Sequence, residues 1–72
     1  MSATTIYAEA ITELTYIKTR CENLSSSKSA QLIEECDHLI TSIRDGVNID
    51  ETELLSSIEI MMDRLNYIVE IN

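Results

Sequence analysis

The first third of the chain carries an uninterrupted apolar repeat that fits only one kind of secondary structure. Its apolar residues are spaced 4-3-4-3-4-3, which is the seam of three heptads: Ala3, Tyr7, Ala10, Leu14, Ile17, Cys21 and Leu24. A strand needs alternation with a period of two, so the segment is not a strand. The repeat predicts a helix over about residues 3–24, with one face packed against another element.

A second segment, about residues 30–44, repeats this spacing with Leu32, Cys36, Leu39 and Ile43, and with Ile33 and Ile40 beside them. The junction 25–29 contains four serines and one lysine, and it leaves two interpretations open. Four serines cost roughly 2 kcal/mol relative to alanine in a helix, which favours a loop. The junction lacks Gly and Pro, and its apolar spacing fits an 11-residue step that a continuous helix tolerates. This favours one long helix over about 3–44.

The next boundary is marked by Gly46, the only glycine in the chain. It follows Arg44 at a position where a helix commonly ends in a left-handed residue. Asp50 then fits a helix N-cap, with Glu53 three residues later. Ile49 and Leu54 fit the apolar contact that often flanks such a cap. The sequence therefore predicts a turn over 45–49 and a third helix over about 51–71.

The third predicted helix has apolar residues on two sides. Its main seam consists of Leu54, Ile58, Met61, Leu65 and Ile68, with Leu55, Met62 and Val69 beside it. Ile60, Tyr67 and Ile71 fall roughly 180–220° from Ile58 and form a second stripe. Either the stripe packs inside the fold or it binds a partner. We take Ile60, Tyr67 and Ile71 as candidate partner-binding residues, and add Tyr16, an outward aromatic residue on the first helix.

These patterns predict one all-α domain over residues 1–72. It is a small antiparallel helical hairpin if residues 3–44 form one helix, and a three-helix bundle with coiled-coil-like seams if they do not. A chain of about this length buries only roughly 60% of its unfolded surface, which leaves little room for an enclosed enzyme pocket.

The charge of the chain excludes several kinds of partner. The net charge is −8, and the five basic residues are scattered. Nucleic acids and anionic membranes bind clustered Lys and Arg, so neither is an expected partner. Residues 47–72 carry six acidic residues and one basic residue, a net charge of −5. That segment suits a partner with a basic rim, although Asp50, Glu51 and Glu53 also complement a helix N-terminus.

No segment resembles a signal peptide or reaches the ~20 apolar residues needed to cross a bilayer. We therefore expect a cytoplasmic protein in which Cys21 and Cys36 are reduced. Together with His38 they do not match the ligand spacing of a zinc site, so we expect buried free thiols and no metal or cofactor. Pairing across a hairpin would bring the two cysteines together. His38 has no nucleophile motif and no Gly-rich loop is present, so we expect no enzymatic activity.

Near 70 residues, acidic, helical and without a cysteine framework, the chain resembles the small YscE/EscE-type co-chaperones of bacterial type III secretion systems. The likeness rests on that makeup and on the helix over residues 55–69, LSSIEIMMDRLNYIV, which follows a polar turn. It implies a cytoplasmic bacterial helical hairpin that pairs with a tetratricopeptide-like chaperone. Together these would keep the needle subunit soluble before export. The partner-facing residues would be Ile60, Tyr67 and Ile71, supported by Tyr16. The chain departs from the family in its turn, since the only strong turn signal is at 45–49 rather than mid-chain.

Two alternatives remain open from the sequence. The heptads fit a self-associating helical oligomer equally well, such as a small phage-type inhibitor. The acidic C-terminal segment also fits a mimic that occupies a basic groove.

Overall fold

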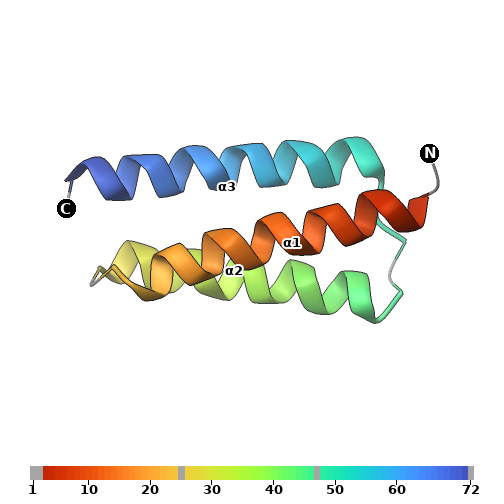
Figure 1. Ribbon diagram of the computed structural model, residues 1–72, viewed down its shortest axis with the longest axis horizontal. Coiled ribbons are helices and arrows are strands. Elements are labelled where there is room, and N and C mark those ends of the chain that lie inside the picture. The colour runs from red at the N-terminus through yellow and green to blue at the C-terminus, as the bar shows by residue number, and fades with distance from the viewer. Residues whose placement is uncertain (1–2, 25, 47, 72) are drawn as a thin grey trace.

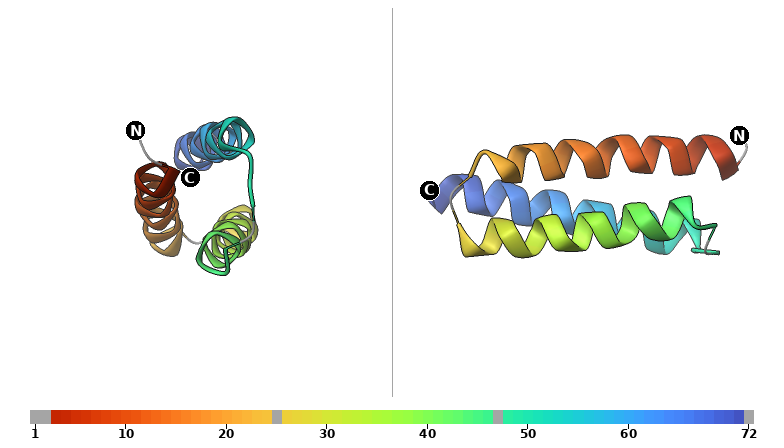
Figure 2. Two further views of the ribbon diagram at one scale, coloured as in Figure 1. Left: turned by 90° about the vertical axis from the view of Figure 1, so that its right-hand side faces the viewer. Right: turned by 90° about the horizontal axis from the view of Figure 1, so that it is seen from below.

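Three helices lie side by side at the corners of a triangle (Figures 1 and 2). The computed structural model describes residues 3–24, 26–46 and 48–71. Its helices are α1 (Ala3–Glu22), α2 (Ser27–Arg44) and α3 (Glu51–Ile71). α1 and α3 run in the same direction, and α2 runs against both (Figure 1). The prediction of an all-α fold is confirmed as a three-helix bundle. The hairpin with one long helix over 3–44 is wrong.

The core is built from the predicted seams of all three helices. α3 buries every residue of its main seam, from Leu54 to Ile68. α1 buries its seam from Ala10 to Cys21, while Tyr7 and Leu24 are partly buried. The side chain of Ala3, which begins the predicted seam, lies outside the described residues. Burying each large apolar side chain stabilises the folded state by roughly 1.5–3 kcal/mol, so the seams supply most of the stability.

α2 departs from its predicted seam in its second half. Ile40, which the spacing places beside the seam, is buried, whereas the seam residues Leu39 and Ile43 are only partly buried. The buried residues of α2 are Ser29, Leu32, Cys36 and Ile40, spaced 3-4-4. That spacing belongs to an 11-residue repeat of about 3.67 residues per turn. The buried residues of α2 therefore stay on one side of the helix.

Serine side chains make the junction between α1 and α2. The Ser26 hydroxyl accepts a hydrogen bond from the backbone N–H of Lys28 and caps α2. The Ser29 hydroxyl donates toward the carbonyl oxygens of Ser26 (2.7 Å) and Leu24 (3.0 Å). Backbone groups freed by the break are thus paired within the junction. Ser25 lies outside the described residues.

The second connection matches the predicted turn. Gly46 has φ of +79°, and its N–H donates to the carbonyl of Ile43 at the end of α2. The Asp50 carboxylate accepts from the N–H of Glu53 and caps α3. The Tyr7 hydroxyl donates to the carbonyl of Ile49 over 2.8 Å and so ties α1 to this connection. Val47 lies outside the described residues.

Gly46 is the position where a small substitution should show a purely conformational cost. No atom lies within 4 Å of where a Cβ would be placed, so crowding does not contribute. We expect Gly46→Ala to lower the free energy of unfolding by about 1–2 kcal/mol, because a left-handed φ is unfavourable for alanine. Gly46→Asn is the control and should cost less, since asparagine tolerates this region. Equal stability of all three proteins in urea denaturation would contradict the argument.

Candidate partner-binding surface

The exposed apolar surface of the described chain is concentrated on α3. Six large hydrophobic side chains are exposed, and five of them belong to this helix: Leu55, Ile60, Tyr67, Val69 and Ile71. The exposed fractions are 60% for Ile60, 53% for Tyr67 and 52% for Ile71. A monomer seldom gathers exposed apolar side chains on one element without a use for them.

Ile60, Tyr67 and Ile71, which we name the α3 ridge, face the side of α3 that is turned toward α2. Ile58 lies at one margin of the buried face, so measuring from it places the ridge too far round the helix. Measured from the middle of the buried face, the ridge is about 100–140° away. The sequence-based description of a stripe opposite the seam is therefore wrong, and the ridge instead flanks a groove.

Contacts between α2 and α3 fix this orientation. The Lys28 ammonium of α2 lies 5.0 Å from the centre of the Tyr67 ring, a cation–π arrangement. Residues 60, 64, 67 and 71 are spaced 4-3-4, so Arg64 belongs to the same line of the helix. Its guanidinium contacts Glu35 of α2 at 2.6 Å.

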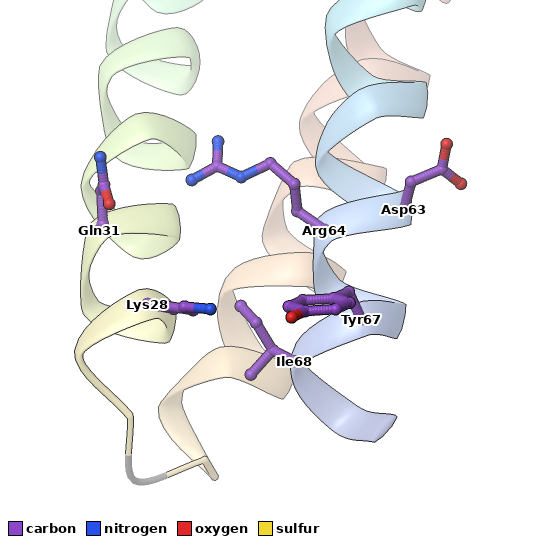
Figure 3. A pocket seen from close by; sticks show the side chains of 6 residues that line it. All are labelled: Lys28, Gln31, Asp63, Arg64, Tyr67 and Ile68. Atoms are coloured by element: carbon purple, nitrogen blue, oxygen red, sulfur yellow. The ribbon is translucent and has the colours of Figure 1, made fainter. Parts of the chain in front are cut away.

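A groove opens at the Lys28 end of the α2–α3 interface (Figure 3). Its volume is about 380 Å³, and it is lined by Lys28, Gln31, Asp63, Arg64, Tyr67 and Ile68. Lys28 and Arg64 extend across it from opposite helices, while the Asp63 side chain points away from α2 (Figure 3). The groove thus combines an apolar floor with cationic groups in a protein whose net charge is −8.

A second cavity of about 350 Å³ continues along the same interface toward the second connection. It is lined by Glu34, Glu35, His38, Leu39, Ser57 and Met61, again from α2 and α3 alone. The Arg64–Glu35 ion pair joins the two cavities, since each contributes one partner. The Oε2 atom of Glu35 is buried and has no hydrogen bond of good geometry among the described residues. The ion pair with Arg64 is therefore the contact that offsets the cost of burying this carboxylate oxygen.

The outer side of α3, beyond the α3 ridge, is acidic. Glu59, Asp63 and Glu70 are exposed there, and the exposed Leu55 and Val69 lie past them toward α1. The acidic strip therefore runs between two apolar edges, which is a pattern suited to a partner with basic residues around an apolar face.

Tyr16 is exposed, but the structure separates it from the α3 ridge. It projects from α1, and no described residue of α1 lines either cavity between α2 and α3. The structure thus brings Ile60, Tyr67 and Ile71 onto one line of α3 and leaves Tyr16 as a single exposed aromatic.

The side chains that could react or bind a metal are dispersed or buried. Cys21 and Cys36 are free thiols with no exposed surface. Burial raises the pKa of Cys21, and it raises the pKa of Cys36 to about 11. Within 3–24, 26–46 and 48–71, no group of three His, Cys, Asp or Glu side chains is placed to hold a metal ion. None of the described helices is long and apolar enough to cross a bilayer.

Comparison with known proteins adds no relative. No family model matches the chain, and neither the curated proteins nor the solved structures contain a significant match. The exposed surface of the protein is therefore the basis for its proposed function.

The polar side of the groove was not identified from the sequence. Lys28, Gln31, Glu35 and His38, which we name the α2 ridge, are spaced 3-4-3 and line the two cavities. The spacing was visible in the sequence, but a polar line on a helix usually faces solvent. Only the packing of α3 beside it shows that this one borders a groove.

Proposed function

We propose that the protein is a non-catalytic binding protein that docks on a partner through the α3 ridge. The observation that carries the proposal is the concentration of exposed apolar side chains on one helix, beside a groove and an acidic strip. Small helical proteins with an incomplete apolar cover gain stability from a partner that binds only the folded state. The acidic strip favours a partner with basic residues at the rim of its binding face.

The sequence resemblance gives this proposal a specific form. In this form of the proposal, the protein is a cytoplasmic co-chaperone of a type III secretion system. It pairs with a tetratricopeptide-like chaperone and keeps the needle subunit soluble before export. Such a subunit presents an amphipathic helix that polymerises unless another helical surface covers it. The α3 ridge supplies an apolar surface of that kind.

Co-expression tests this form of the proposal. The chain is produced with the candidate chaperone and needle subunit of its own source genome, and the complex is purified by size exclusion. We expect co-elution and a melting midpoint several degrees above that of the chain alone. Equal midpoints alone and in the mixture would contradict it. A homo-oligomer that persists on dilution in sedimentation would assign the ridge to self-association instead.

Charge substitutions on the α3 ridge should remove binding without unfolding the chain. Ile60→Glu and Tyr67→Glu place a carboxylate on exposed positions, so helicity in circular dichroism should be unchanged. Partner affinity should fall by about 100-fold, since an unpaired charge would be buried in the interface.

Asn66→Glu is the matched control for these variants. Asn66 is exposed on the same helix but lies off the ridge, so this variant adds the same charge and should bind within about threefold of wild type. If Asn66→Glu weakens binding as much as Ile60→Glu, net charge rather than the ridge determines affinity.

A further inference from the structure

We infer that the partner inserts one amphipathic helix into the α2–α3 groove and that this helix runs parallel to α3. The inference rests on the proposed function and adds to it the shape, direction and charge order of the bound segment. The occupant would be a helix with one apolar face, a basic N-terminal part and an acidic C-terminal part.

The two sides of the groove already have the periodicity of helix–helix packing. On α3, residues 60, 64, 67 and 71 follow a 4-3-4 spacing, and three of the four are exposed apolar side chains. On α2, residues 28, 31, 35 and 38 follow a 3-4-3 spacing and are polar. Side chains at this spacing present a seam to a neighbouring helix. A fourth helix would set its apolar face on the α3 ridge and its polar flank on the α2 ridge.

Helix dipoles give no preference for either direction of the bound helix. At the Lys28 end of the groove α2 begins and α3 ends, and at the other end the reverse holds. Because the partial charges at the two termini have opposite signs, they largely cancel at each end. The direction is left to the charged side chains along the groove.

Those side chains differ between the two ends. Among the described residues, the Lys28 ammonium contacts the Tyr67 ring and no carboxylate, so it is available to an acidic group. The exposed Asp63 also lines this end of the groove, but its side chain points away from α2 and Lys28 (Figure 3). Toward the other end, Glu34 lines the second cavity and is exposed, without an ion-pair partner among the described residues. A bound helix therefore gains most with its negative C-terminal end over Lys28 and its positive N-terminal end over Glu34. That direction is parallel to α3.

Charge also argues for a different protein rather than a second copy of this chain. The net charge of −8 opposes association of two copies. A copy of α3 laid parallel in the groove would also bring its own Glu51 and Glu53 toward Glu34.

Two synthetic 18-residue helical peptides test the inference on the full chain. Both have the same composition and the same leucine face, and both carry a nitroxide at the C-terminus. The matched peptide has lysines in its first third and glutamates in its last third, and the reversed peptide exchanges them. We expect the matched peptide to bind roughly fivefold more tightly. Its nitroxide should broaden the amide NMR signals of residues 28–31 and 67–71.

Lys28→Glu is the decisive variant. Lys28 is exposed in the first turn of α2, where a carboxylate is favourable for the helix, so the variant should stay folded. It should abolish or reverse the preference between the two peptides. The inference is overturned if the peptides bind equally, if neither binds, if the broadening lies at residues 45–50, or if Lys28→Glu changes nothing.

Ile60→Glu separates this inference from the proposed function. If it abolishes binding of both peptides but the two bind wild type equally, the ridge is a docking surface and the inferred direction is wrong. If it leaves both affinities unchanged, the ridge is not the docking surface and the proposed function fails.

Discussion

Leu65→Glu and Ile58→Glu are expected to unfold the protein. Leu65 is 2% exposed and Ile58 4% exposed, both within the apolar core. A carboxylate placed there has no cationic partner, and burying it costs on the order of 5 kcal/mol or more. A domain of this size has about 4–10 kcal/mol of stability in total. The loss therefore consumes most or all of the free energy of unfolding.

Circular dichroism at 222 nm measures the effect, and Ile60→Glu is its matched control. The control makes the same substitution two residues from Ile58, but at an exposed position. It should retain the helical signal and a cooperative thermal transition, whereas the two core variants should lose both. Loss of helicity in all three, or in none, would mean that α3 has no division between a buried and an exposed face.

The stability of the protein is expected to fall steeply between about pH 9 and 11 because of Cys36. Burial raises the pKa of this thiol from 9.0 to about 11, with a further contribution from the neighbouring Cys21. Below pH 9 the thiol is protonated in the folded and unfolded chains, and its stabilising effect is complete. Between the two values the unfolded thiol ionises while the folded one does not, which favours unfolding. The total loss is about 3 kcal/mol.

Urea denaturation at a series of pH values measures this loss, and Cys36→Ala is the control. The variant is less stable at every pH because it leaves a cavity, so the slopes with pH are compared rather than the absolute values. The slope should be shallower without Cys36, because the variant has no thiol to ionise at this position. In parallel, the folded wild type should react slowly with a disulfide reagent at pH 8, because the thiolate is the reactive form. Equal slopes together with rapid thiol labelling would show that Cys36 is accessible.

The sequence predicts helices best where periodicity and end signals coincide. α3 begins at Glu51 and ends at Ile71, as expected from Asp50, Gly46 and the long apolar seam. Those signals are local, because a cap and a left-handed glycine act through neighbouring backbone groups. Local chemistry of this kind can be read without knowing which helices pack together.

The α1–α2 junction was harder to predict because its signal was incomplete. α1 ends two residues earlier than expected and α2 begins three residues earlier. Ser26 caps α2, but the third residue of the helix is Ser29 rather than the Glu or Gln of a capping box. The Ser29 hydroxyl instead donates back toward two carbonyl oxygens. Helix propensity scales do not include a contact of this kind. A run of serines therefore looked neutral between a loop and a helix.

The candidate surface likewise has one part that local sequence predicts and one part that depends on how the helices pack. The exposure of Ile60, Tyr67 and Ile71 follows from spacing within one helix, and the structure agrees with it. The groove beside them depends on the angle and register between α2 and α3, which involve residues far apart in the sequence, such as Glu35 and Arg64. Periodicity in one segment has no information about that register.

An odd number of helices sets the geometry of any fusion to this protein. α1 starts at one end of the bundle and α3 finishes at the other (Figure 1), and the longest dimension is 38 Å. A label or affinity tag joined ahead of α1 is thus remote from Lys28 and Tyr67, whereas one joined behind α3 sits next to them. A circular permutant would need a linker of about a dozen extended residues to bridge the two ends.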